Sequence, residues 1–281
     1  MATQGLSLLG FLDEAEGIAH LRSKCIPSDS SNDALAAEWR IARMGLGSPV
    51  TGAGHPAIDA IPSSHHQYVQ RLRRAAWLQP NLSGPWSGAR FCMIEIDKLL
   101  AFSILIDTQR SGHYGAAMSR PPLLSEMLET CLPQQPTGER MDMWDGANKQ
   151  SMLIKARSLN VSIVERGAFT DNRVGIAVGV TLPLLHVVVS NDRHYLHNGY
   201  HRAYAMRQAG ATYAPCILRE VADDAAIGIR SDGSTFSAAL LESENPPTLA
   251  HFTQGRAHPV IVRSISRIIH VSWMEYAVAD E

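Results

Sequence analysis

The sequence predicts an α+β fold, in which a mixed sheet with helices is preceded by a helical N-terminal extension and followed by a C-terminal extension containing strands. Composition is the first observation: 281 residues with 45% hydrophobic and 19% charged side chains allow a sizeable core. The second is an alternating apolar and acidic pattern near residue 95, typical of a strand. The third is a strand–turn–strand–glycine–helix–strand order over residues 184–220.

Charge and cysteine content limit the function classes. The 25 Lys and Arg residues against 27 Asp and Glu residues give a net charge of −2, which argues against a protein held to nucleic acid by bulk charge. The four cysteines form no CxxC pair and are typical of reduced thiols in the cytoplasm. The first twenty residues lack a basic start and make a poor secretory signal. We therefore expect a cytoplasmic protein without a membrane partner, and a nucleic-acid partner is not favoured.

Residues 1–90 are predicted to form the mainly helical extension. Asp33 is the expected cap of a helix that ends at Gly45, and a Gly- and Pro-rich connector follows it. A second helix is predicted over residues 65–78, with three arginines on its wet face. We interpret these arginines as a solvated surface, with phosphate contact as the alternative.

The segment 91–107 begins with a predicted strand. Ile94 and Ile96 alternate there with Glu95 and Asp97, so the strand has one apolar and one acidic side. The simplest interpretation of the acidic side is a solvated face, and a catalytic or metal-binding role is the alternative.

The elements predicted after residue 107 are based on the positions of proline and glycine and on apolar segments. A helix is predicted over 123–131, a polar loop over 133–146, and a closing strand within 267–278. The uncharged stretch Val174–Asn191 has about the length of a minimal membrane span. Because it contains two glycines and a proline and is rich in valine, we predict two buried strands there instead of a transmembrane helix.

The chemistry is concentrated in residues 184–220, where a strand ends at Asn198 and a helix follows the Gly199 turn. Gly199 has no side chain, so another group can approach the backbone closely. The helix that follows presents unpaired N–H groups and its positive dipole end, which favour an anion. Arg202 in the first turn can clamp a phosphate, and His201 can donate a hydrogen bond or exchange a proton near neutral pH. The alternative is an ordinary strand–glycine–helix junction with a surface arginine.

This segment, YLHNGYHRAYAMRQAGATYAPCIL, resembles the ParB/sulfiredoxin superfamily. Gly199, Arg202 and Ala205 fit the Gly-x-x-Arg-x-x-Ala box of that superfamily, and Gly210 and Pro215 fit its continuation. Upstream, MIEIDKLLAF resembles the first strand of the same fold.

The resemblance implies a division of the chain. A ParB/sulfiredoxin-like domain would span residues 91–220, with an insertion near 113–172. Residues 1–90 would be the N-terminal extension, and residues 221–281 a C-terminal extension packing on the core.

In that superfamily the box binds nucleotide phosphates. The cofactor-binding residues implied here are therefore Asn198, Gly199, Tyr200, His201 and Arg202. Sulfiredoxins carry a reactive cysteine just before the His-Arg pair, whereas this chain has Tyr200, so thiol repair at that position is not expected. ParB proteins continue into a helix-turn-helix domain, and no such pattern follows residue 220.

The function that follows is a nucleotide-binding enzyme, a kinase-like phosphotransferase that acts on a small molecule with ATP or another nucleotide and Mg²⁺. Such an enzyme needs a base and charge neutralisation. The expected catalytic residues are Glu95, Asp97 and His201, and Asp107 is a further candidate for base or metal ligand. The first alternative is a non-catalytic, nucleotide-dependent switch or binding module.

A weaker alternative is a metal-dependent hydrolase or nuclease that uses the histidines crowded around the glycine turn. His186, His194, His197 and His201 lie there, with His113 as a possible third ligand. Because His197 and His201 straddle the turn, they do not share one helix face. We therefore predict no metal site formed by these histidines.

Overall fold

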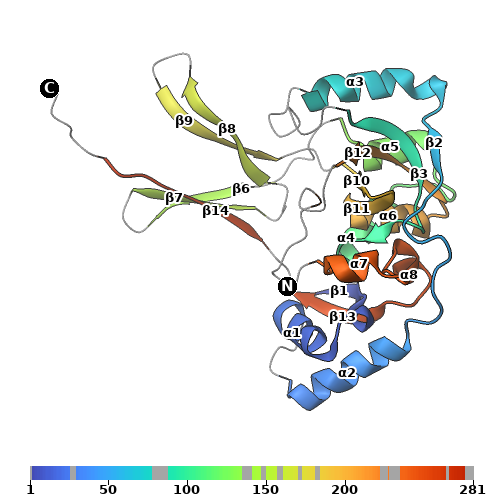
Figure 1. Cartoon of the computed structure of the whole chain (residues 1–281). Coiled ribbons are helices and arrows are strands. Elements are labelled where there is room, and N and C mark those ends of the chain that lie inside the picture. Colours follow the sequence, from blue (N-terminus) through green and yellow to red (C-terminus); the bar gives the residue numbers. More distant parts are fainter. Residues whose placement is uncertain are drawn as a thin grey trace. The chain divides into compact units, whose positions relative to one another are not determined.

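The computed structural model of the chain is shown in Figure 1. It describes residues 2–25, 30–77, 88–134, 141–146, 150–156, 161–169, 173–180, 184–221, 227, 235–263 and 266–275. The chain divides into two compact units. Unit 1 comprises Met1–Arg74, Gly84–Gln134 and Pro183–Ser264, and unit 2 comprises Ala75–Ser83, Gln135–Leu182 and Ile265–Glu281. Unit 1 thus draws on all three segments expected from the sequence, and the boundaries at residues 90 and 220 stay a prediction.

Unit 1 is built on a six-stranded mixed sheet of order β2-β3-β12-β10-β11-β4. The β10–β12 and β11–β4 pairs are parallel, and the other three pairs are antiparallel. Its strands are β2 (Ile58–Ala60), β3 (Arg90–Glu95), β4 (Leu100–Ala101), β10 (His186–Ser190), β11 (Arg193–Asn198) and β12 (Tyr213–Glu220). The expected order of elements over residues 184–220 is therefore confirmed, and so is the general α+β class.

A second, antiparallel sheet in unit 1 joins segments far apart in the chain. It has the order β13-β1-β5, formed by β1 (Ala2–Ser7), β5 (Leu105–Asp107) and β13 (His258–Arg263). The N-terminal part is therefore not only helical, because its first segment is a strand. The strand β1 was not predicted, because its six residues include only two apolar side chains and therefore show no clear alternation.

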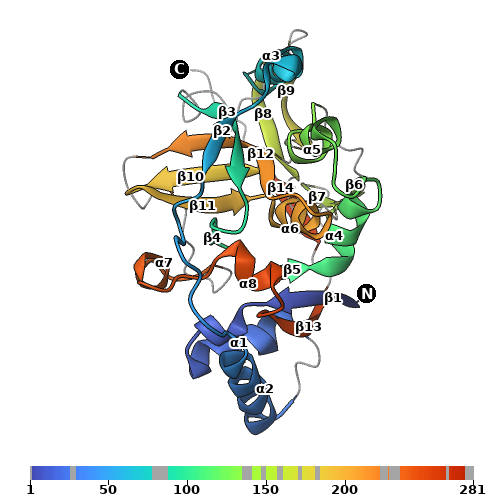
Figure 2. The ribbon, with the colours of Figure 1, turned by 90° about the vertical axis from the view of Figure 1, so that its right-hand side faces the viewer.

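Helices surround the two sheets (Figures 1 and 2). They are α1 (Glu14–Lys24), α2 (Asn32–Met44), α3 (His66–Trp77), α4 (Thr108–Gly115), α5 (Leu124–Cys131), α6 (Tyr200–Gln208), α7 (Ala238–Glu242) and α8 (Leu249–Thr253), with 3₁₀ turns η1 (Leu9–Phe11) and η2 (Ser63–His65). The cap of α2 is Ser31, whose hydroxyl accepts from the Ala34 N–H, and not Asp33 as predicted. Across the described ranges, no helix has the length and apolar character of a membrane span.

Unit 2 contains two small antiparallel sheets. One has the order β14-β7-β6, formed by β6 (Met141–Asp145), β7 (Ser151–Ala156) and β14 (Arg267–Ser272), and the other pairs β8 (Val161–Phe169) with β9 (Arg173–Val180). The expected polar loop thus contains the strand β6. The uncharged stretch holds two strands, β9 and β10, but only β10 is buried, since Ile176 on β9 is 42% exposed. The two strands pair with different partners and belong to different units.

The position of α6 decides where the expected site lies. Ala203, Ala205 and Met206 are buried on this helix, and the small alanine side chains allow close helix packing. The neighbours of α6 are α4, α5 and α8, and α4 lies directly beside it (Figure 2).

Candidate functional site

The turn between β11 and α6 requires glycine. Gly199 has φ of 94°, a left-handed conformation that side chains other than glycine rarely adopt. A Cβ atom at this position would also lie 2.9 Å from Cα of Leu185. The Asn198 Oδ1 accepts a 2.8 Å hydrogen bond from the Gly199 N–H, and the Tyr200 hydroxyl donates to the His197 carbonyl. The side chains of Asn198 and Tyr200 therefore stabilise the turn itself.

Arg202 is a buried cation in the first turn of α6. The residue is only 5% exposed, and its Nε has no hydrogen-bond partner in the described part of the chain. Its guanidinium lies 4.6 Å from the centre of the Tyr114 ring, a cation–π contact. Burial lowers the pKa of Arg202; Tyr114 and Cys131 raise it, and Arg110 lowers it. No carboxylate is among these neighbours, so the arrangement leaves a desolvated positive charge for an anion.

His201 is held as a neutral imidazole. Its Nε2 accepts a hydrogen bond from the Asp107 backbone N–H at 3.2 Å, so the ring proton is on Nδ1. Burial lowers the pKa of His201 to about 4, and Arg110 and Arg202 lower it too, while Asp107 raises it. The expected proton exchange near neutral pH therefore does not fit this histidine, which serves instead as a neutral hydrogen-bonding group.

The α4 helix supplies the other half of the site. Asp107 caps α4, because its Oδ1 accepts from the Arg110 N–H at 3.0 Å, and its Oδ2 accepts from the Thr3 hydroxyl at 3.1 Å. Arg110 and Tyr114 are four residues apart and therefore lie on one face of α4. Both are close enough to Arg202 to change the pKa of its guanidinium. We call Arg110, Tyr114, His201, Arg202 and the first turn of α6 the anion site. Sequence reasoning missed Arg110 and Tyr114, whose one signal was this helical spacing.

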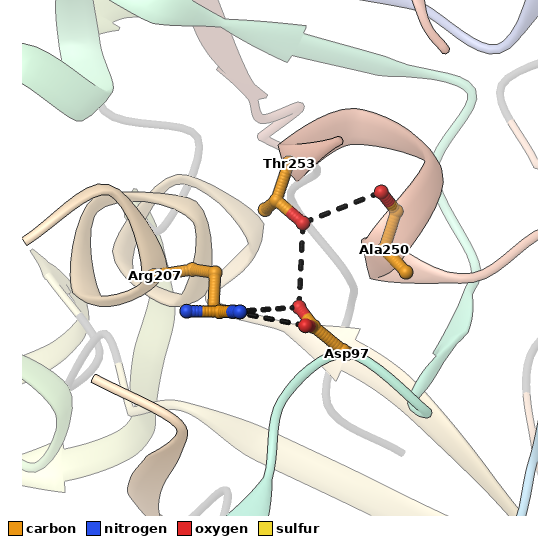
Figure 3. Close-up of polar contacts among 4 residues, drawn as sticks. All are labelled: Asp97, Arg207, Ala250 and Thr253. Carbon is orange, nitrogen blue, oxygen red and sulfur yellow. Dashed lines mark hydrogen bonds and ion pairs between the residues drawn. The ribbon is translucent and has the colours of Figure 1, made fainter. Parts of the chain in front are cut away.

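Glu95 and Asp97 lie at the opposite end of α6. The Nε of Arg207 bonds both carboxylate oxygens of Asp97, at 3.0 and 2.9 Å, and the Thr253 hydroxyl adds a 3.3 Å hydrogen bond (Figure 3). Since a helix rises 1.5 Å per residue, Arg207 is roughly 10 Å along α6 from its start. Asp97 thus joins α6 to α8 and is not brought to the anion site.

Glu95 is also held by neighbours in the fold. Its Oε2 lies 3.1 Å from the Lys98 ammonium and accepts a 3.1 Å hydrogen bond from the Ala57 N–H. It pairs in register with Tyr213, which follows the C-terminal end of α6. The strand alternation correctly put Glu95 outside the core, but it could not show which end of α6 the strand meets.

The histidines do not gather at one point, although two of their rings touch. The rings of His186 and His197 contact edge to face at 5.1 Å, His194 Nδ1 lies 3.2 Å from the Gly54 carbonyl, and His113 Nδ1 lies 2.7 Å from the Gln109 carbonyl. Among the residues that the structure describes, no three His, Cys, Asp or Glu side chains are grouped to hold a metal ion. The described histidines therefore give the hydrolase alternative no support.

Comparison with known proteins adds no relative. No family model, no curated protein and no solved structure matches this chain. The site is accordingly interpreted from its own geometry, which provides buried positive charge at a helix N-terminus.

Proposed function

We propose that this chain binds the phosphate groups of a nucleotide at the anion site and transfers a phosphoryl group to a small molecule. One observation carries the proposal: Arg202 is buried, lacks a carboxylate neighbour, and has an Nε without a hydrogen-bond partner among the described residues. A phosphate would supply both the missing negative charge and the missing acceptor oxygens.

Three further features of the site favour phosphate. The first-turn N–H groups of α6 are available to an anion, as at other helix N-termini. Gly199 adopts the left-handed conformation that lets α6 begin directly after β11, with Leu185 packed against it. Arg110 is a second cation close enough to affect the pKa values of both His201 and Arg202. The resemblance to the ParB/sulfiredoxin superfamily favours a nucleotide as the carrier of this phosphate.

Binding requires a movement of Tyr114. Its ring occupies one face of the Arg202 guanidinium, at 4.6 Å, and the arginine is almost fully buried. A phosphate oxygen would exchange this cation–π contact for a charge-assisted hydrogen bond, which is the stronger interaction. We expect α4 to shift or Tyr114 to rotate when the ligand binds.

The transfer step needs a group that accepts the proton of the acceptor hydroxyl. Asp107 contacts the anion site through its backbone bond to His201, and we propose it in place of Glu95 and Asp97. His201 would donate from Nδ1 to a ligand oxygen. Mg²⁺ that entered with the nucleotide would be held by the phosphates and would neutralise their charge.

Calorimetry tests the proposal. ATP, ADP, CTP and GTP would be titrated, with and without Mg²⁺, into the native chain, Arg202→Met and the control Arg40→Met. Arg40 is a surface arginine paired with Glu14. We expect one nucleotide to bind and Arg202→Met to weaken it by roughly 1.5–3 kcal/mol, tenfold or more. Failure of every nucleotide to bind the folded native chain, or equal effects of the two variants, would overturn the proposal.

A nucleotide-dependent switch is the second candidate. Two observations favour it. Arg202 is buried against Tyr114, so a ligand must displace that contact. The Asp107 carboxylate oxygens already accept hydrogen bonds from Thr3 and Arg110, which makes Asp107 a weaker base. Phosphorus NMR distinguishes the two functions, with serine and glycerol as probe acceptors. Nucleotide consumed only when an acceptor is present supports the phosphotransferase, and binding without consumption supports the switch.

A further inference from the structure

Two buried cysteines lie opposite each other on neighbouring strands of the six-stranded sheet. Cys92 on β3 and Cys216 on β12 are direct partners in the antiparallel register, and their sulfur atoms are 3.6 Å apart. Cys92 is 4% exposed and Cys216 is fully buried. The pairing of β3 with β12 would allow any two apolar side chains at this position, and aliphatic residues are the usual choice in a core. We call these two residues the dithiol pair.

We infer that the dithiol pair is a reversible oxidation site, converted to a disulfide by a small peroxide. Directly opposed residues in an antiparallel pair have Cα atoms about 4.5–5.5 Å apart, which lies within the range that disulfides span. The sulfur atoms therefore need only rotate toward bonding distance, without a strand movement. This site is independent of the anion site and does not rest on the proposed nucleotide function.

The two sulfurs have different roles. The hydrogen bond between the two sulfurs lowers the pKa of Cys92; burial opposes this shift, and Arg90 adds to it. Burial and the Cys92 sulfur raise the pKa of Cys216 well above its usual value. Since the thiolate is the nucleophile, Cys92 is the attacking sulfur and Cys216 the resolving one. Cys92 is also the more accessible of the two to a small oxidant.

The remaining cysteines provide internal controls. Burial raises the pKa of Cys131 to about 12 and that of Cys25 to about 11, so neither forms a thiolate readily. Both are buried and free. They should remain as thiols while the dithiol pair reacts.

The chemistry balances with hydrogen peroxide as oxidant. The Cys92 thiolate attacks one peroxide oxygen, the O–O bond breaks, and with one proton water leaves, which gives the sulfenic acid. The Cys216 sulfur then attacks the Cys92 sulfur, the S–O bond breaks, and a second water leaves with the Cys216 proton. The pair has lost two electrons and two protons, and peroxide has been reduced to two molecules of water. A dithiol reductant reverses the step by exchange.

Alkylation and mass spectrometry test the inference on the full chain. The reduced protein would be treated with hydrogen peroxide, then unfolded in iodoacetamide and digested. We expect four alkylated cysteines before oxidation and two after it, with a crosslinked pair of peptides carrying Cys92 and Cys216. Cys25→Ala and Cys131→Ala should keep the crosslink, while Cys92→Ala and Cys216→Ala should lose it. Four alkylated cysteines after oxidation, or a crosslink that involves Cys131, would overturn the inference.

A second measurement does not depend on any variant. Phenylarsine oxide condenses with two adjacent thiols, forming two As–S bonds and releasing one water. We expect the native reduced chain to take up one arsenical, which protects the dithiol pair from later alkylation. Uptake that leaves all four cysteines open to alkylation after removal of unbound reagent would contradict the dithiol site, even if a variant failed to fold.

Discussion

Replacement of Gly199 by alanine tests how tightly the start of α6 is held against the preceding segment. Two costs are expected. An alanine at φ of 94° is strained by about 1 kcal/mol relative to glycine. Its Cβ would also meet the Leu185 backbone at 2.9 Å, which forces a shift of main-chain atoms, and overpacking of this kind costs about 1–3 kcal/mol. We expect Gly199→Ala to lower the free energy of unfolding by about 2–4 kcal/mol.

Gly210 offers a matched control at the other end of the same helix. Its φ is 97°, nearly that of Gly199, but a Cβ there would meet no atom within 4 Å. Gly210→Ala should therefore show only the conformational cost of about 1 kcal/mol. The difference between the two variants isolates the contact with Leu185.

Urea unfolding, followed by far-ultraviolet circular dichroism, measures both variants. Equal m-values would show that the comparison concerns stability alone. Equal losses in the two variants, or a larger loss for Gly210→Ala, would refute the claim that a close backbone approach shapes the anion site. A Gly199→Ala chain that is stable but no longer binds nucleotide would mean that the approach serves the ligand.

Three further predictions concern stability. Asp97→Asn should lower the free energy of unfolding by about 1–2 kcal/mol, because it weakens the partly buried ion pair with Arg207. Glu14→Gln, at an exposed ion pair, should lower it by about 0.5 kcal/mol or less. Equal urea midpoints for the two variants would contradict this prediction. Burial lowers the pKa values of His201 and His251 to about 4, so between pH 6.5 and 4 the unfolded chain binds protons that the folded chain does not. The free energy of unfolding should rise with pH across that window, by about 3 kcal/mol per histidine, and His251→Gln should flatten the slope in urea titrations at several pH values. Oxidation of the dithiol pair would close a loop of 124 residues and should raise stability by about 2–4 kcal/mol, and reduction should remove the gain.

Local patterns predicted the elements around the anion site well. The glycines at 199 and 210 mark the two ends of α6, and valine-rich and alternating segments mark the strands beside it. These signals were sufficient to predict the elements because, within one helix or strand, the backbone conformation is uniform and buried positions recur at a fixed spacing. The α2 cap was misassigned because Ser31 and Asp33 are both good capping residues two positions apart.

The surroundings of Glu95 and Asp97, which were expected to be catalytic, could not be assigned in the same way. Alternation predicted Glu95 and Asp97 on one side of a strand, but β3 ends at Glu95, and its pairing with β12 decides that both carboxylates meet the C-terminal end of α6. Their charges are then satisfied by Lys98 and Arg207. Lys98 is close to Glu95 in the sequence, but Arg207 lies 110 residues from Asp97, so no local pattern could indicate that contact.

The sequence by itself determined the α+β class, the β11–α6 turn and the presence of an arginine in the first turn of the helix. Only the tertiary structure decided that Arg202 is buried against Tyr114, that His201 is neutral, and that Cys92 touches Cys216. The physical reason is that periodicity and breakers report the environment of one element. Desolvation and the contacts between charged or reactive groups arise only when elements distant in the chain pack together.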